Sequence, residues 1–175
     1  MSGEGEISVR VAILTVSDRS ARGERKDLSG PALRALVEAR GWQVTQTAVV
    51  ADDREAVRAI LCRWCDEDLA EVALTTGGTG FAPRDVTPEA TQQAIEREAP
   101  GLAEAMRAGS LAVTPHGMLS RGVAGIRRRS LIINLPGSPR AACESLQTIL
   151  PVLEHAVDLL RERPQAEGGH HRMSA

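Results

Sequence analysis

The sequence has few of the residues that bind unpaired nucleic-acid bases. It contains no tyrosine, one phenylalanine and two tryptophans in 175 residues, which leaves few aromatic rings on which bases could stack. Its formal net charge is −2, whereas nucleic-acid-binding domains usually present a basic surface. Both observations argue against a nucleic-acid partner.

Long apolar segments are lacking as well. The N-terminal segment MSGEGEISVRVAILTVS has no basic region before its apolar run, and Arg10 interrupts that run. The segment therefore fits neither a signal peptide nor a membrane span. We expect no membrane association and a cytoplasmic location.

The three cysteines are too few and too unevenly spaced for a disulfide framework. Cys62 and Cys65 form a CxxC sequence, but they fall well inside a helical pattern, whereas redox cysteines usually sit at a helix N-terminus. No second CxxC or nearby histidine completes a zinc site. Two half-buried structural thiols are therefore favoured over redox or metal chemistry.

Strand-like and helical segments alternate along the chain. Apolar, β-branched runs predict strands at residues 9–16, 42–50, 71–76 and 130–135, and helical spacing predicts helices that begin near residues 31, 54, 88, 101 and 139. This alternation predicts a single α/β domain over residues 7–163, a doubly wound, mostly parallel sheet flanked by helices. Residues 1–6 and 164–175 are expected to be disordered, and residues 18–30 and 113–129 show no regular pattern.

Three predicted strands end in loops of unusual composition, which begin with TVSD at Thr15, TTGGTG at Thr75 and NLPGSP at Asn134. Ligands of doubly wound sheets bind beyond the carboxyl ends of the strands. The loop over residues 18–30 is also longer than a neutral connection usually is. We therefore expect these loops to form the ligand-binding side of the sheet.

The glycine-rich loop after the third strand is suited to phosphate. Glycines at 77, 78 and 80 can turn backbone N–H groups toward an anion, and Thr79 adds a hydroxyl. The loop is neither a Walker A motif nor a dinucleotide fingerprint, because no Lys-Ser/Thr pair follows and Pro83 replaces the third glycine. A plain strand-to-helix turn remains the alternative.

Two aspartates indicate a cation beside this loop. Asp85 follows the glycines, and Asp52 ends the preceding strand-to-helix connection, so both can lie on one rim. Carboxylates beside a phosphate require a cation between them, and Mg²⁺ takes such ligands together with phosphate oxygens and water. Helix capping is the alternative for Asp52. Arg84 is expected to pair with phosphate, Asp85 or Glu89, and Thr87 to cap the next helix.

The four histidines lie outside these three loops, which argues against an imidazole base or a Ser-His-Asp arrangement. Phosphoryl or nucleotidyl transfer remains compatible with this absence. When the attacking group is an ionised phosphate, the protein has only to position the reactants and stabilise charge.

Six motifs in order resemble the molybdopterin adenylyltransferase family, which includes bacterial MogA and MoaB and the G domains of plant molybdenum insertase and gephyrin. They are TVSD at 15–18, DLSGP at 27–31, TTGGTGFAPRDVTPEAT at 75–91, IEREAPG at 95–101, TPHGMLSR at 114–121 and LIINLPGSP at 131–139. The resemblance implies an enzyme that uses ATP and Mg²⁺ to adenylylate the terminal phosphate of molybdopterin, with release of pyrophosphate.

The resemblance also implies the site residues by position. Asp52 and Asp85 match the magnesium ligands, Asp27 matches the aspartate of the DxSG loop, and Ser120 matches a serine of the transfer step. The ligand-binding loops correspond to Ser17, Gly77, Gly78, Thr79, Gly80, Asn134, Pro136, Gly137 and Ser138.

A homotrimer and a separate molybdenum insertase as partner are further implications of the resemblance. Two residues depart from the family pattern: Leu28 stands where many relatives carry a basic residue, and Ala51 where many carry proline. Neither departure removes a ligand. A non-catalytic molybdopterin carrier and a scaffold protein remain the alternatives to an enzyme.

Overall fold

The computed structural model describes residues 8–164. The predicted disordered ends lie outside this range except for Pro164. In chain order the elements are β1 (Arg10–Val16), α1 (Asp18–Ala21), α2 (Ser29–Ala39), β2 (Gln43–Val50), α3 (Arg54–Asp66), β3 (Val72–Thr76), α4 (Thr87–Ala94), β4 (Arg97–Glu98), α5 (Pro100–Val113), the 3₁₀ helix η1 (Pro115–Leu119), β5 (Ala124–Arg127), β6 (Ser130–Leu135) and α6 (Pro139–Leu160).

The strands form one sheet in the order β2-β1-β3-β6-β5-β4. The first four are parallel, and β5 and β4 continue the sheet antiparallel. The predicted α/β class with a mostly parallel sheet is therefore confirmed.

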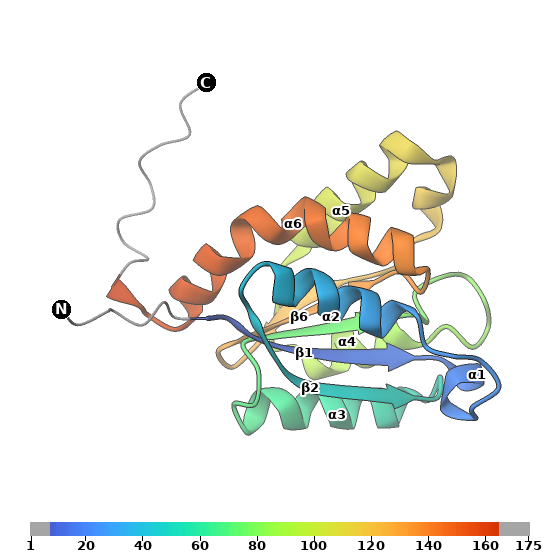
Figure 1. Ribbon diagram of the computed structural model, residues 1–175, viewed down its shortest axis with the longest axis horizontal. Coiled ribbons are helices and arrows are strands. Elements are labelled where there is room, and N and C mark those ends of the chain that lie inside the picture. The colour runs from blue at the N-terminus through green and yellow to red at the C-terminus, as the bar shows by residue number, and fades with distance from the viewer. Residues whose placement is uncertain (1–7, 165–175) are drawn as a thin grey trace.

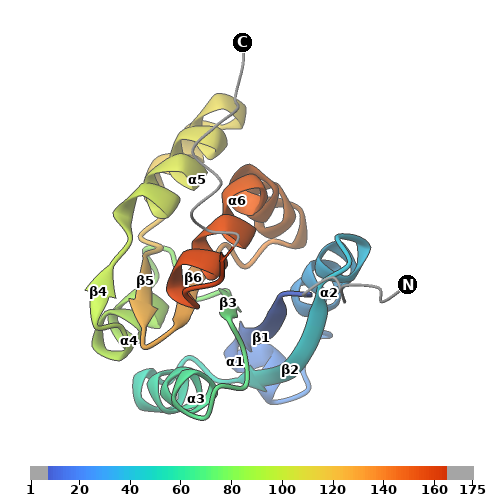
Figure 2. The same cartoon turned by 90° about the vertical axis from the view of Figure 1, so that its left-hand side faces the viewer.

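Helices cover both faces of the sheet, with α2, α5 and α6 above it and α3 and α4 below it in Figure 1. Alternate residues of β1 explain the two layers, because successive side chains of a strand point to opposite faces. Val11 and Ile13 pack in the core with α2 and α6, whereas Ala12 and Leu14 pack with α3 and α4. Figure 2 shows the same layers from the side.

Four local predictions were wrong. The supposed loop over residues 18–30 contains the short helix α1, and α2 begins at Ser29, two residues before Pro31. The helix predicted to reach residue 98 ends at Ala94, where the chain turns into β4. Part of the irregular region 113–129 is the 3₁₀ helix η1 and strand β5.

The fourth error concerns Thr87, which does not cap α4. Val86 occupies the N-cap position without a side-chain bond, and the buried Thr87 hydroxyl instead donates to the Gly77 carbonyl at 2.9 Å. This bond ties the start of α4 to the glycine loop. Asp53, not Asp52, is the N-cap of α3 and accepts from the Ala56 N–H at 2.7 Å.

The topology places the ligand site between β1 and β3. These strands are neighbours, but β1 continues to β2 on one side of the sheet while β3 lies next to β6 on the other. Such a switch point leaves a crevice beyond the carboxyl ends of the two strands. In Figure 1 this end of the sheet is on the right, beside α1.

Candidate active site

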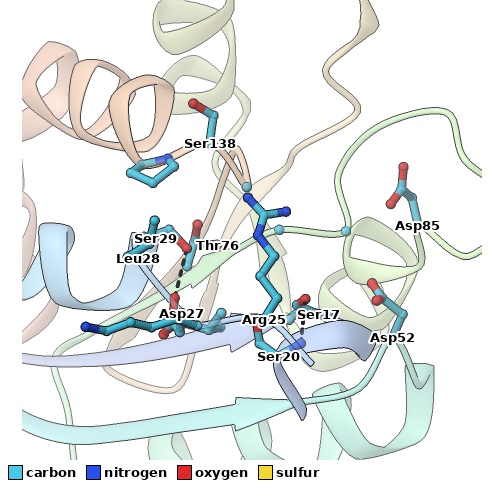
Figure 3. A pocket seen from close by; sticks show the side chains of 17 residues that line it. Ser17, Ser20, Arg25, Asp27, Leu28, Ser29, Asp52, Thr76, Asp85 and Ser138 are labelled. Atoms are coloured by element: carbon cyan, nitrogen blue, oxygen red, sulfur yellow. Dashed lines mark hydrogen bonds between the residues drawn. The ribbon is translucent and has the colours of Figure 1, made fainter. Parts of the chain in front are cut away.

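A cavity of about 410 Å³ opens beyond the carboxyl ends of β1 and β3 (Figure 3). Four chain segments form most of its wall. The lining residues are Thr15–Ser17, Ser20, Arg25–Ser29, Asp52, Thr76–Gly78, Asp85 and Gly137–Pro139. Eight of the predicted site residues are among them: Ser17, Asp27, Asp52, Gly77, Gly78, Asp85, Gly137 and Ser138.

Gly77 and Gly78 are required by the backbone at the end of β3. Both have positive φ angles, +100° and +65°. A Cβ atom at Gly77 would lie 2.3 Å from the Val16 carbonyl oxygen, and one at Gly78 would lie 2.3 Å from the Thr87 hydroxyl and 3.0 Å from an Asp52 carboxylate oxygen. Only glycine therefore lets this loop lie close to both β1 and Asp52.

Three backbone donors of the glycine loop after β3 have no partner in the described part of the chain. Among the described residues, none accepts a hydrogen bond from the N–H groups of Gly78, Thr79 or Gly80. Buried N–H groups are almost always paired, and Thr79 is only 7% exposed. The N-terminus of the 22-residue helix α6, capped by Ser138, adds a positive dipole end. Both features favour an anion such as phosphate.

Asp52 is held by a reciprocal contact with Asp18. The Asp18 N–H donates to the Asp52 carboxylate at 2.8 Å, and the Asp52 N–H donates to the Asp18 carboxylate at 3.0 Å. Arg84, for which phosphate, Asp85 and Glu89 were the expected partners, forms an ion pair with Asp18 and with neither of those two carboxylates. This pairing lowers the pKa of Asp18, chiefly through the hydrogen bond from Arg84.

The environment of Asp52 fits a cation. Burial raises the pKa of Asp52, and the charges of Asp18 and Asp85 raise it further. A positive ion between Asp52 and Asp85 would relieve that repulsion. Within residues 8–164 no cluster of three or more His, Cys, Asp or Glu side chains is arranged to hold a metal, so an ion here would take its other ligands from phosphate and water, as Mg²⁺ does.

Arg121 fixes the loop that presents Asp85, a role that its sequence position did not predict. Its backbone N–H donates to the Thr79 carbonyl at 2.9 Å, and its guanidinium donates to the carbonyls of Gly80 and Asp85, both at 2.7 Å. A third contact is an ion pair with Glu89. Its position in the MLSR motif was the only available signal, since its partners are distant in the sequence.

Asp27 lies in the cavity wall, and its carboxylate accepts three hydrogen bonds from neighbouring residues. Its carboxylate accepts hydrogen bonds from the Thr15 hydroxyl at 2.7 Å, from the Gly30 N–H at 3.0 Å and from the Ser29 hydroxyl at 3.3 Å. These bonds join the end of β1 to the start of α2. Asp27 therefore orders this wall of the site.

Five predicted site residues lie outside this cavity, namely Thr79, Gly80, Ser120, Asn134 and Pro136. Ser120, Asn134 and Pro136 line a second, much smaller cavity of about 10 Å³ next to α5. The Pro136 carbonyl accepts from the Thr76 hydroxyl at 2.7 Å.

Asn134 is buried, with 2% of its surface exposed. Its amide group donates to the hydroxyls of Thr75 and Thr91 at 3.0 and 2.8 Å, and its carbonyl accepts from the Val123 N–H at 3.2 Å. Both N–H atoms are therefore used within the chain. In this structure Asn134 connects β6, β3 and α4.

The CxxC cysteines lie on α3, away from the cavity. Cys65 is buried, Cys62 is partly buried, and both are free thiols. Burial raises the pKa of Cys65 to about 12. A thiol of that pKa is protonated at neutral pH and is a poor nucleophile, which agrees with the structural interpretation.

The sheet, the cavity at its switch point and the carboxylates beside unpaired N–H groups define an α/β protein with a site suited to a phosphate-bearing ligand. Residues 12–155 match the family described as "probable molybdopterin binding domain". The chain therefore belongs to the molybdopterin-binding domain family.

Named relatives agree with this assignment. The chain is 40% identical to a molybdopterin adenylyltransferase of Helicobacter pylori over 155 residues, 87% of this chain and 88% of that one. It is 44% identical to the molybdenum cofactor synthesis protein cinnamon of Drosophila melanogaster, where the match covers 87% of this chain but 26% of that protein. The crystal structure of the molybdopterin biosynthesis enzyme MoaB from Thermus thermophilus superposes with a TM-score of 0.84 at 49% identity, covering 89% of this chain and 98% of that one.

Within the described residues, no helix combines the length and the apolar character needed to cross a membrane.

Proposed function

We propose that this protein is a molybdopterin adenylyltransferase, which transfers AMP from ATP to the terminal phosphate of molybdopterin and releases pyrophosphate. The similarity to a named molybdopterin adenylyltransferase over 87% of the chain supports this proposal. The observation that carries it is local: Asp52 and Asp85 line one cavity with Gly77 and Gly78, and the N–H of Gly78 has no partner among the described residues.

The reaction needs no base from the protein. An oxygen of the molybdopterin phosphate forms a bond to the α-phosphorus of ATP, the bond from that phosphorus to the bridging oxygen breaks, and its electron pair leaves with pyrophosphate. The attacking phosphate is already ionised at neutral pH. The absence of histidine from the cavity wall is consistent with such a step, in which the chain positions two anions and offsets their repulsion.

Asp52 and Asp85 are the residues that would hold Mg²⁺. A Mg²⁺ ion held there would supply positive charge that offsets the charge of the phosphates. The reciprocal contact with Asp18 holds Asp52 in place, and Arg121 holds the main chain at Asp85. The unpaired N–H groups of the glycine loop, those of Gly78, Thr79 and Gly80, would donate hydrogen bonds to phosphate oxygens.

Ser120 and Asn134 are proposed to act beside the phosphate site. Ser120 lines the small cavity, where its hydroxyl accepts from the Gly122 N–H at 3.4 Å. This weak contact leaves its hydroxyl available to the molybdopterin phosphate. Asn134 is proposed to order the strand ends around the nucleotide through its contacts with Thr75 and Thr91.

The test is to incubate the purified protein with molybdopterin, ATP and Mg²⁺ and to measure adenylylated molybdopterin and pyrophosphate. We expect both products in equal amounts. Molybdopterin binding without ATP consumption would favour the non-catalytic carrier instead.

We further propose a homotrimer in the cytoplasm that passes its product to a separate molybdenum insertase. The assembly is testable by sedimentation equilibrium, where a mass other than three chains would contradict it. Co-purification with molybdenum-cofactor enzymes alone would support the biosynthetic role over a scaffold role.

A further inference from the structure

Arg25 differs from most arginines of the described chain in having no partner. Arg84 and Arg121, for example, are held by carboxylates and main-chain carbonyls. By contrast, no described residue accepts a hydrogen bond from the Arg25 guanidinium or pairs with it, although Arg25 lines the main cavity. A charged group kept unpaired in a cavity is available to a ligand of opposite charge.

Lys26 is a second unpaired cation in the same wall. It follows Arg25 and also lines the cavity, and no described residue forms an ion pair with it. It is the only lysine in the sequence, among 21 basic residues. Its amine is therefore a unique chemical reporter for this wall of the cavity.

The backbone that presents Arg25 is fixed from both sides. The N–H groups of Glu24 and Arg25 donate to the Arg19 carbonyl of α1 at 2.9 and 3.2 Å. On the other side, the Asp27 carboxylate is bound by Thr15 and Gly30. The two cations therefore stand on an anchored turn.

Arg25 and the acidic pair occupy different parts of the cavity. In Figure 3 the Arg25 side chain extends from the α1–α2 loop toward Ser138, whereas Asp52 and Asp85 lie together on the other side. A chain of phosphates is a ligand that matches both sides at once. One end would meet the cations and the α6 N-terminus, and another part would meet a metal ion held by the carboxylates.

We propose that Arg25 binds the polyphosphate of the nucleotide, and that Lys26 adds a second positive charge at this rim. This inference rests on the proposed adenylyltransferase function and names the residue that selects a triphosphate over an uncharged nucleoside. Arg25 suits this role because its planar guanidinium can form two parallel bonds to phosphate oxygens.

The first experiment uses Lys26 as a reporter in the unmodified protein. The amine is acylated with a limiting amount of an N-hydroxysuccinimide ester, and modification at Lys26 is followed by mass spectrometry with the α-amino group as reference. We expect ATP and pyrophosphate to slow the labelling of Lys26 several-fold, and adenosine to have little effect. Equal labelling with and without pyrophosphate would count against the proposal.

The second experiment compares Arg25→Gln with Arg63→Gln. Arg63 lies on α3, is exposed, lacks a partner among the described residues and is outside the cavity wall, so it controls for the loss of one positive charge. We expect Arg25→Gln to weaken pyrophosphate and ATP binding by about ten- to hundredfold, the range for a hydrogen bond to a charged group. Adenosine affinity should not change.

Arg63→Gln should leave all three affinities unchanged, and Arg25→Lys should restore part of the pyrophosphate affinity because it keeps the charge but not the second donor. Unchanged pyrophosphate affinity in a folded Arg25→Gln variant would overturn the proposal. These measurements need no molybdopterin, so they separate the two claims. If the wild type binds pyrophosphate through Arg25 but makes no product, the proposed adenylyltransferase function is wrong. If the protein is active but Arg25→Gln does not change ATP or pyrophosphate affinity, the proposed role of Arg25 is wrong.

Discussion

Replacing Arg121 by glutamine should loosen the loop that carries Asp85. The guanidinium of Arg121 donates to the carbonyls of Gly80 and Asp85 and pairs with Glu89. It thus connects both ends of the 80–85 loop with the first turns of α4. Glutamine keeps a polar side chain of moderate length but cannot make all three contacts or carry the charge.

The contacts set the size of the effect. The Arg121 and Glu89 side chains are 34% and 38% exposed, so their ion pair contributes up to about 1 kcal/mol. Each bond to a main-chain carbonyl contributes about 1 kcal/mol because water can partly replace it. The free energy of unfolding should therefore fall by roughly 2–3 kcal/mol, which corresponds to a decrease in Tm of roughly 4–12 °C for a chain of this size. Displacing Asp85 by about 1 Å should lower turnover about a hundredfold.

The pH dependence provides an internal check. Burial acts to raise the pKa of Glu89, but the hydrogen bond from Arg121 holds it below its ordinary value of 4.5. A lowered pKa contributes stability above pH 4.5 that is lost as the pH falls through the folded-state pKa. The stability difference between wild type and Arg121→Gln should therefore narrow below about pH 4.5. Urea unfolding at several pH values measures this difference.

A second substitution separates stability from loop placement. Adding Glu89→Gln to Arg121→Gln removes the unpaired carboxylate, so part of the lost stability should return, while turnover stays low because the 80–85 loop remains untied. If Arg121→Gln unfolds at the wild-type temperature and turns over at the wild-type rate, the loop is held by other contacts and the reasoning fails.

Three further predictions concern Asp85, Asp18 and Cys65. Asp85→Asn should lower turnover about a hundredfold or more with the fold intact. We expect Mg²⁺ to raise the Tm of the wild type and Asp85→Asn to abolish that increase; retention of the increase would exclude Asp85 as a ligand. Asp18→Asn loses the ion pair with Arg84 but can still accept from the Asp52 N–H, so we expect about tenfold weaker activation by Mg²⁺ with kcat nearly retained at saturating metal. Burial raises the pKa of Cys65 to about 12, so this thiol should resist iodoacetamide at pH 8 until the protein is unfolded. Because the folded-state pKa is higher than the unfolded-state pKa, the stability that the protonated thiol contributes is present below pH 9 and is lost as the pH rises toward 12.

The fold was predictable from the sequence because the apolar patterns of the strands and helices match the layers of the folded protein, a sheet covered by helices on both faces. Runs such as Val9–Val16 are buried on both faces, which only a covered, mostly parallel sheet provides. The errors arose where tertiary contacts override local preference. Thr87 followed by proline is a favourable helix start, but its hydroxyl instead binds Gly77, ten residues earlier. Nothing in the local sequence reports that contact.

Prediction of the site had the same limits. The residues in the cavity wall follow strand ends, where topology alone brings them together, and Asp52 and Asp85 are found there as expected. Asp18 and Arg121 were missed because each acts across the chain. Asp18 contacts Asp52, 34 residues away, and Arg121 contacts Asp85, 36 residues away. Local sequence patterns identify charged residues near strand ends, but they do not show which of these residues contact each other over such separations.

The charges around the cavity are arranged unequally, and this asymmetry favours a ligand that brings both a metal ion and phosphate. On the acidic side, Asp18 and Arg84 neutralise each other and fix Asp52, yet Asp52 and Asp85 still repel. On the opposite side, Arg25 has no partner among the described residues. A bare metal ion would satisfy only the carboxylates, and a bare phosphate would satisfy only the cations and the N–H groups. A metal-bound polyphosphate satisfies both sides together, so ATP and Mg²⁺ should each bind more tightly in the presence of the other.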